Sequence, residues 1–150
     1  MTRILFVCLG NICRSPMAKY IFKDIIRRKG FEGDFLIDSA ATSKEEAGNG
    51  LYYNAKMKLA EKNVAYDNHI AKQITKSDYE KFDYIIGMEK SNVENILKII
   101  GEDSQNKVYR LLDFSNNPKD IADPWYTRDF EKTYVEIVEG CEALLKHIIK

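Results

Sequence analysis

The run Cys8-Leu9-Gly10-Asn11-Ile12-Cys13-Arg14-Ser15-Pro16 directly follows the apolar stretch Ile4–Val7 and precedes a helical pattern. It predicts a strand, a short turn and a helix. Backbone N–H groups of such a turn bind anions, and the N-terminus of the helix adds positive charge. A cysteine in that field is expected to be a thiolate near neutral pH, and Arg14 can hold two oxygens of a tetrahedral dianion. Together these groups indicate cleavage of a phosphate ester through a phosphocysteine.

Length and composition limit the classes of protein. The chain has 150 residues, so a single domain over residues 1–150 is expected, burying roughly 70% of its unfolded surface. Its 23 basic and 23 acidic residues cancel, whereas nucleic-acid-binding proteins more often carry a basic excess. No apolar stretch approaches the ~20 residues of a membrane span, and Thr2–Val7 resembles a core strand more than a signal peptide. We therefore expect a cytoplasmic protein that binds neither nucleic acid nor membranes.

The cysteines also indicate a cytoplasmic protein. Cys8, Cys13 and Cys141 form neither a disulfide framework nor a zinc-binding spacing. A thiol nucleophile is easiest to maintain in a reducing compartment. We expect no metal and no cofactor, a monomer or weak dimer, and a Cys141 that is an inert core residue.

Apolar runs and helical patterns alternate along the chain. Strands are predicted over Ile4–Val7, Phe35–Ser39, Tyr84–Met88 and Lys107–Leu111, and helices over Met17–Arg28, Tyr53–Lys62, Ser91–Ile100 and Arg128–His147. This alternation predicts a single-domain, three-layer α/β fold. A central four-stranded parallel sheet would be covered on both faces, and the phosphate-binding loop would join the first strand to the first helix.

Local signals refine two parts of this fold. Ser15 is expected to cap the first helix, with Pro16 in its first position. The segments Ala40–Leu51 and Asp113–Thr127 are predicted loops. Because ligands of parallel sheets bind at the carboxyl ends of the strands, both loops and Cys8 are expected to meet at one edge.

Asp123 is the second candidate catalytic residue. An aspartate before proline is commonly a turn residue. However, a phosphate monoester needs a proton on its leaving oxygen, which neither Cys8 nor Arg14 can supply. Pro124 restricts Asp123 to an extended backbone, which would help to hold its carboxyl group over the pocket.

Five blocks of the sequence resemble the low-molecular-weight protein tyrosine phosphatase family. They are Cys8–Pro16, Asp38–Ser43, His69–Thr75, Phe82–Ile86 and Asp123–Tyr126, in the family's order. The resemblance implies that Cys8 attacks phosphorus, that Arg14 binds the equatorial oxygens, and that Asp123 acts as general acid and then as general base. The phosphate-binding residues would be Leu9, Gly10, Asn11, Ile12, Cys13, Arg14 and Ser15. The implied substrate is a phosphotyrosine-containing protein, with small aryl phosphates also hydrolysed and inorganic phosphate or other oxyanions as inhibitors.

The resemblance also implies supporting roles. Ser15 would donate a hydrogen bond to the thiolate, and Asn11 would adopt a left-handed backbone that fixes the loop. His69 and Ser39 would join a polar network with Asn11. Cys13 would form a reversible disulfide with Cys8 or simply pack beneath the loop.

Four residues are expected to shape the substrate cleft. Trp125 and Tyr126 would form its aromatic wall, and Ile12 would favour a phosphotyrosine-like substrate. Glu45 stands where many relatives have an aromatic residue, so weaker aryl stacking and a preference for basic flanking residues are expected. Gly50 would loosen this loop.

Three other functions share parts of this pattern. Arsenate reductases of the same fold need a further redox cysteine pair, whereas only Cys141 lies downstream. Arginine phosphatases of this fold typically carry threonine at the position of Ile12 and lack the Trp-Tyr pair. A non-catalytic phosphate-binding module would have no reason to keep both Cys8 and Asp123.

Overall fold

The four strands pair in parallel in the order β2-β1-β3-β4 in the computed structural model, which describes residues 1–150. They are β1 (Thr2–Cys8), β2 (Phe35–Ala41), β3 (Tyr84–Gly87) and β4 (Val108–Arg110). The chain passes from β1 to β2 on one side and then returns to β3 on the other side. The ends of β1 and β3 therefore flank the point at which the strand order reverses, where parallel sheets bind ligands. The predicted sheet is confirmed.

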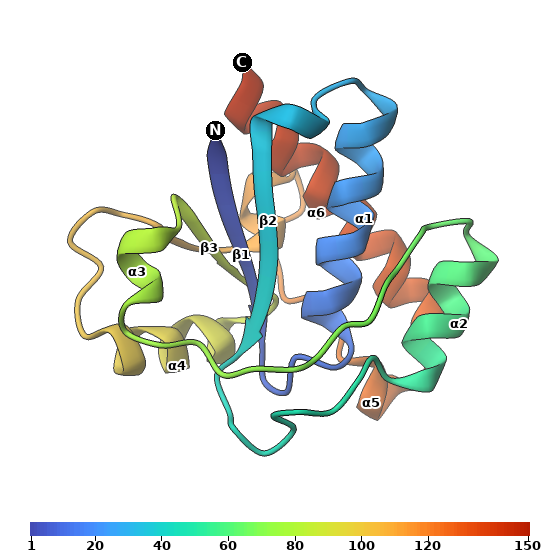
Figure 1. Cartoon of the computed structure of the whole chain (residues 1–150), viewed down its shortest axis with the longest axis horizontal. Coiled ribbons are helices and arrows are strands. Elements are labelled where there is room, and N and C mark those ends of the chain that lie inside the picture. Colours follow the sequence, from blue (N-terminus) through green and yellow to red (C-terminus); the bar gives the residue numbers. More distant parts are fainter.

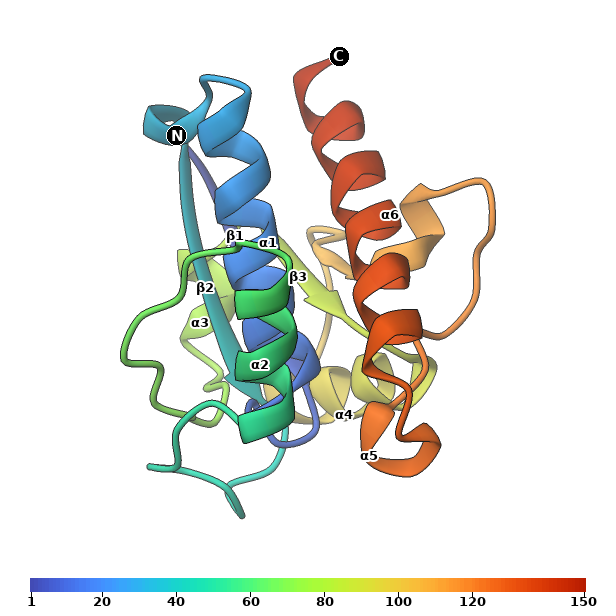
Figure 2. The same cartoon turned by 90° about the vertical axis from the view of Figure 1, so that its right-hand side faces the viewer.

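Helices cover both faces of the sheet (Figure 1). The longer helices are α1 (Arg14–Arg28), α2 (Tyr53–Glu61), α4 (Lys90–Ile100) and α6 (Phe130–Ile149), and the shorter ones are α3 (Asp78–Lys81) and α5 (Pro124–Thr127). The helices α1, α2 and α6 lie on one side, with α1 and α6 side by side (Figure 2), whereas α3 and α4 lie on the other. This arrangement confirms the three predicted layers. None of the helices combines the length and apolarity needed to cross a membrane.

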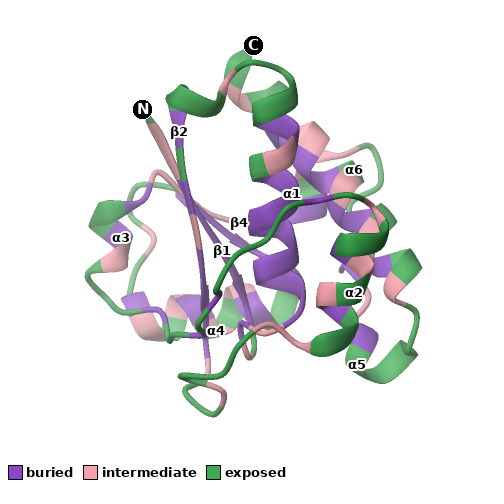
Figure 3. Cartoon of the chain, turned by 45° about the vertical axis from the view of Figure 1, so that its right-hand side comes forward, coloured by how far each residue is buried: buried purple, intermediate pink, exposed green.

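The side chains of β1 alternate between two apolar cores. Ile4, Phe6 and Cys8 belong to the core under α1 and α6, whereas Leu5 and Val7 belong to the core under α4. Figure 3 shows this central strand as buried. Burial of each large side chain contributes about 1.5–3 kcal/mol, so a shift of the strand by one residue is strongly disfavoured. The register therefore turns the side chain of Cys8 toward the start of α1.

Two local expectations were wrong. Helix α1 begins at Arg14, so Ser15 is inside its first turn and makes no capping bond; its hydroxyl group lies next to Cys8 instead. Pro16 is the third residue of the helix and not, as predicted, the first. It is tolerated there because N–H groups of the first turn have no partner within the helix. The predicted Asp113–Thr127 loop contains α5 and the end of a 3-10 turn, Leu111–Phe114. Such short helices leave no periodic pattern in a sequence.

Gly140 of α6 provides a test of the packing between this helix and the 3-10 turn. A Cβ atom at Gly140 would lie 2.5 Å from Cγ of Leu111. Alanine is favoured over glycine inside a helix by about 1 kcal/mol, but overpacking costs about 1–3 kcal/mol. We expect Gly140→Ala to lower the free energy of unfolding in urea by about 1 kcal/mol. Gly33→Ala, which meets no atom within 4 Å, is the control, and a more stable G140A would contradict the prediction.

Candidate active site

Cys8 ends β1, and its sulfur is nearly buried beneath the turn that leads into α1. The Sγ atom lies 3.0 Å from Oγ of Ser15, and the N–H of Asn11 donates to it at 3.3 Å. The Asn11 side chain donates to the same Ser15 oxygen at 2.8 Å, so the hydroxyl proton can be directed to the sulfur or, at 3.4 Å, to the carbonyl oxygen of Ala40. Two hydrogen-bond donors can therefore face a thiolate at Cys8.

Asn11 has the predicted left-handed backbone, with φ of 60°. Its side chain is buried and fully engaged. Besides Ser15, Nδ2 donates to Oγ of Ser39 at 3.0 Å, and Oδ1 accepts from the N–H of Lys72 at 3.2 Å. The carboxamide thus joins the loop to β2 and to the segment that follows His69.

Four carbonyl groups of the loop are bonded to segments outside it. Cys8 O accepts from Thr42 N at 2.9 Å, Leu9 O from Ser43 N at 3.0 Å, Ile12 O from Tyr52 N at 2.9 Å, and Asn11 O lies 2.7 Å from His69 Nε2. In a trans peptide the N–H points opposite to the C=O. The N–H groups of Leu9, Gly10, Ile12 and Cys13 therefore point to the other side of the loop, and no acceptor in the protein uses them. They form a nest of donors for an anion.

Arg14 is almost completely buried at the start of α1. One guanidinium nitrogen donates to the carbonyl of Ile121 at 2.9 Å. The second terminal nitrogen of the guanidinium lies 3.1 Å from Oε1 of Glu89 and 3.4 Å from Oδ2 of Asp123. Burial lowers the pKa of Arg14, but the negative charges of Cys8, Asp123 and Glu89 outweigh it and raise the pKa overall. The guanidinium is thus a fixed cation beside the loop.

Asp123 is held in place because it caps the N-terminus of α5. Its Oδ1 accepts from the N–H of Trp125 at 3.0 Å, while Oδ2 faces Arg14. The preceding residue, Ala122, is bound to α6: its N–H donates to Glu136 at 3.0 Å, and its carbonyl accepts from Thr133 at 2.9 Å. One carboxylate oxygen of Asp123 is therefore fixed and the other is directed toward the loop.

A cleft of about 280 Å³ joins these groups. Its lining residues are Cys8, Leu9, Gly10, Ile12, Cys13, Arg14, Ser43, Glu45, Glu46, Asp123, Trp125 and Tyr126. Trp125 and Tyr126 are both exposed, and the Trp125 ring packs on Tyr52 with centroids 5.2 Å apart. Four of the predicted site residues do not line the cleft, namely Asn11, Ser15, Ser39 and His69.

Comparison with known proteins agrees with this geometry. The profile described as low molecular weight phosphotyrosine protein phosphatase matches residues 3–150. The chain belongs to this family. It is 39% identical to the low molecular weight protein-tyrosine-phosphatase YfkJ of Bacillus subtilis, over 100% of this chain and 97% of that one. It is 38% identical to the chicken (Gallus gallus) low molecular weight phosphotyrosine protein phosphatase, over 95% of this chain and 93% of that one.

Solved structures of phosphatases share the fold. The crystal structure of YfkJ superimposes with a TM-score of 0.95 at 39% identity, covering 99% of this chain and 94% of that one. A Drosophila arginine phosphatase superimposes with a TM-score of 0.90 at 28% identity, covering 100% of this chain and 99% of that one. The shared fold therefore includes phosphatases named for different substrates.

Sequence reasoning missed two acidic residues of this family member's site. Glu89, directly after β3 and Met88, contacts Arg14. Its position at the reversal of strand order is the signal that could have found it. Glu46 lines the cleft beside Glu45, and its carboxylate accepts from Asn49 at 2.7 Å. The mouth of the cleft is thus more acidic than predicted.

The remaining cysteines are buried and free. Burial, reinforced by the negative charges of Cys8 and Asp123, raises the pKa of Cys13 to about 12. Cys13 is therefore a neutral thiol in this state, and its disulfide with Cys8 stays a prediction. Cys141 is fully buried in the core between α1 and α6, as predicted.

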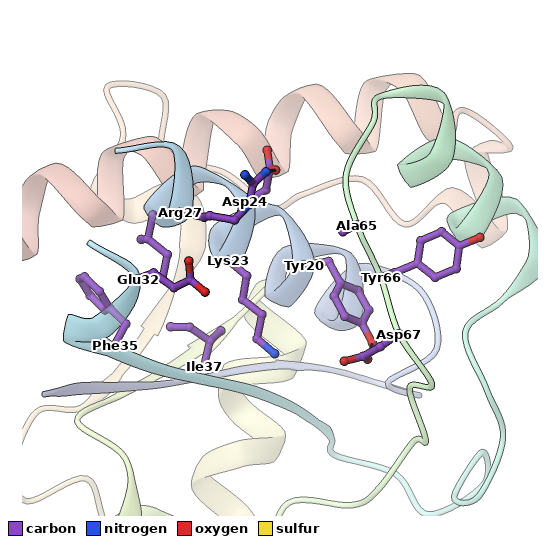
Figure 4. A pocket seen from close by; sticks show the side chains of 11 residues that line it. Tyr20, Lys23, Asp24, Arg27, Glu32, Phe35, Ile37, Ala65, Tyr66 and Asp67 are labelled. Carbon is purple, nitrogen blue, oxygen red and sulfur yellow. Dashed lines mark hydrogen bonds and ion pairs between the residues drawn. The ribbon is translucent and has the colours of Figure 1, made fainter. Parts of the chain in front are cut away.

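A second groove, of about 390 Å³, lies between α1, β2 and residues 65–67 (Figure 4). Lys23, Glu32, Phe35 and Asp67 are among its lining residues. It holds no cysteine and none of the predicted site residues. No group of His, Cys, Asp or Glu side chains in the protein is arranged to hold a metal ion.

Proposed function

We propose that this protein hydrolyses phosphotyrosine in proteins, and small aryl phosphates, through a phosphocysteine on Cys8. The observation that carries the proposal is the meeting of a thiol, a buried guanidinium and a carboxyl group in one cleft, around a nest of free N–H groups. Phosphoryl transfer depends mainly on positioning and charge stabilisation, which these fixed donors supply.

In the first step, the Cys8 thiolate attacks phosphorus as the bond to the leaving oxygen breaks. Asp123 gives its proton to that oxygen, so the alcohol leaves neutral. Arg14 and the loop N–H groups bind the remaining phosphoryl oxygens.

In the second step, water attacks the phosphocysteine. The Asp123 carboxylate accepts the water proton, the P–S bond breaks and inorganic phosphate is released. The thiolate that departs is met by the Ser15 hydroxyl, 3.0 Å from Sγ, and by the N–H of Asn11. Inorganic phosphate and other oxyanions would bind the same nest and inhibit.

The cleft favours an aryl ester over the alternatives. Trp125, Tyr126 and Ile12 are among its lining residues. Arsenate reduction would need further redox cysteines, but Cys141 is fully buried. An arginine phosphatase of the same fold exists among the structural neighbours, so phosphoarginine is the second candidate substrate. The cytoplasmic location and a monomer or weak dimer stay predictions.

Cys8→Ser tests the phosphocysteine. We expect the wild type to hydrolyse 4-nitrophenyl phosphate in the presence of a chelator, and the variant to show no measurable hydrolysis because it has no thiolate. Cys141→Ala, which removes a thiol from the core, is the control and should retain activity. Full activity of Cys8→Ser would end the proposed mechanism.

Asp123→Asn tests the proton donor while keeping an oxygen for the Trp125 N–H. We expect kcat for phenyl phosphate, whose leaving group needs a proton, to fall about 10²- to 10⁴-fold. The loss for 4-nitrophenyl phosphate should be much smaller, and inhibition by vanadate should persist. Asp120→Asn, in the same loop but outside the cleft, is the control. Equal losses for both esters would show that Asp123 is not the acid.

The acidic residues at the mouth of the cleft predict a preference for certain residues beside the phosphotyrosine of a peptide substrate. We expect phosphotyrosine peptides with lysine beside the phosphotyrosine to have higher kcat/KM than those with glutamate, because Glu45 and Glu46 attract the cation. Exposed ion pairs contribute about 0.2–1 kcal/mol, so Glu45→Gln or Glu46→Gln should reduce the preference by a factor of about 1.4 to 5, and salt should weaken it. Glu32→Gln, far from the cleft, should not change it. A preference for acidic flanking residues would refute the role assigned to Glu45 and Glu46. Phosphoarginine peptides belong in the same panel, because phosphoarginine is the second candidate substrate.

A further inference from the structure

Lys19 is a buried lysine that the mechanism above does not use. It lies on the second turn of α1, is 7% exposed, and forms no ion pair with a carboxylate. Burying an ammonium group is costly unless it is paired or hydrogen-bonded. Its partner is a ring nitrogen: Nζ lies 2.8 Å from Nδ1 of His69. Lys19 therefore directs its charge at a histidine behind the phosphate-binding loop.

The contacts of His69 determine which nitrogen carries its proton. Nε2 lies 2.7 Å from the carbonyl oxygen of Asn11, which can only accept, so Nε2 must donate. Nδ1 must then accept from the Lys19 ammonium group. The pair is complementary only when the imidazole is neutral and its hydrogen is on Nε2.

This tautomer sets the direction of one donor of the anion nest. His69 holds the carbonyl of Asn11 behind the loop, and the N–H of Ile12 belongs to the same peptide. Because that peptide is trans, its N–H points away from His69. The contacts from Lys19 through His69 and Asn11 thus end at a backbone donor beside the cleft.

We propose that Lys19 is a positioning residue that locks His69 in the Nε2–H tautomer and thereby fixes the Ile12 N–H for the phosphoryl group. The proposal rests on the proposed function of the loop as a phosphate cradle. No hydrogen bond joins Lys19 to Ile12, so the effect passes through His69 and the Asn11 peptide.

The charges around the pair support the neutral imidazole. Burial lowers the pKa of His69, and the Lys19 cation lowers it further, which outweighs the bond to Asn11 and the nearby carboxylates. Burial also lowers the pKa of Lys19. The other charged groups that face the two residues are Lys23 of α1, Asp38 of β2, and Asp67 and Lys72 of the segment that carries His69.

Tyr20 separates this pair from the second groove. Its ring meets the His69 ring edge-on with centroids 6.4 Å apart, and Lys19 Nζ lies 4.7 Å from the Tyr20 centroid. The Tyr20 hydroxyl donates to Asp67 at 2.6 Å, and both residues stand at one end of the groove in Figure 4. The Tyr20 ring thereby packs against both members of the pair.

The test compares wild type with Lys19→Met, which keeps the length of the side chain but not its donor or charge. Lys23→Met, one turn along α1, is the matched control. Imidazole ¹⁵N spectra of His69 between pH 5 and 8 report the tautomer and pKa without any need for hydrolysis. Inhibition by inorganic phosphate and kcat for 4-nitrophenyl phosphate report the loop.

In the wild type we expect a neutral Nε2–H imidazole at pH 7. In Lys19→Met we expect a mixture of tautomers, a higher pKa of His69, and a phosphate inhibition constant raised about two- to tenfold, as for one weakened hydrogen bond. Lys23→Met should change none of these markedly. An Nδ1–H or charged imidazole in the wild type would overturn the proposal even if Lys19→Met failed to fold.

An unchanged tautomer and phosphate affinity in Lys19→Met, or an equal effect of Lys23→Met, would also overturn it. A wild type with no hydrolysis would refute the proposed function separately, because the ¹⁵N spectra would still report whether Lys19 controls His69.

Discussion

The orientation of the peptide groups between Cys8 and Arg14 is the constraint on which the site depends. Four of their carbonyl oxygens are bonded from outside by residues after β2, before α2 and at His69. A peptide that turned over would lose such a bond and leave a buried polar group unpaired, at about 1–3 kcal/mol. The motif therefore obtains its shape from its surroundings as much as from its own residues. Anion affinity is a property of the whole carboxyl edge of the sheet.

The groups around the loop also compensate for the burial of the Arg14 cation. Arg14 is out of solvent, yet a carboxylate after β3, a second one before α5 and a backbone carbonyl face it. Removing a charge from water is costly unless such partners compensate. Since one of these partners is Asp123, the cation that would hold the phosphoryl group also positions the candidate acid. Binding and proton transfer are thus built around one guanidinium.

Much of this arrangement follows from the sequence because it is local. A few consecutive residues are enough to recognise the apolar run of β1, the turn after it and the Asp-Pro pair. The Ser15 hydroxyl was misassigned because a helix start offers it two partners, and only the fold shows that the sulfur is the closer one. The Lys19–His69 contact spans 50 positions, and Glu89 reaches Arg14 across 75. Such pairings depend on how α1, β3 and the intervening segments pack, for which no local pattern exists.

The attachment of Ala122 to Glu136 and Thr133 has a further consequence. The carboxyl group beside Ala122 takes its position from the last helix, whereas the anion nest takes its position from β2, Tyr52 and His69. Mutations on one face of α6 are therefore expected to act first on the carboxyl group, and to reach the anion nest only through the ion pair between Asp123 and Arg14. Mutations behind the loop do the reverse. The two halves of the site thus rest on separate parts of the scaffold and are joined at Arg14. A new position for the carboxyl group can therefore arise from changes in α6, with the rest of the scaffold retained.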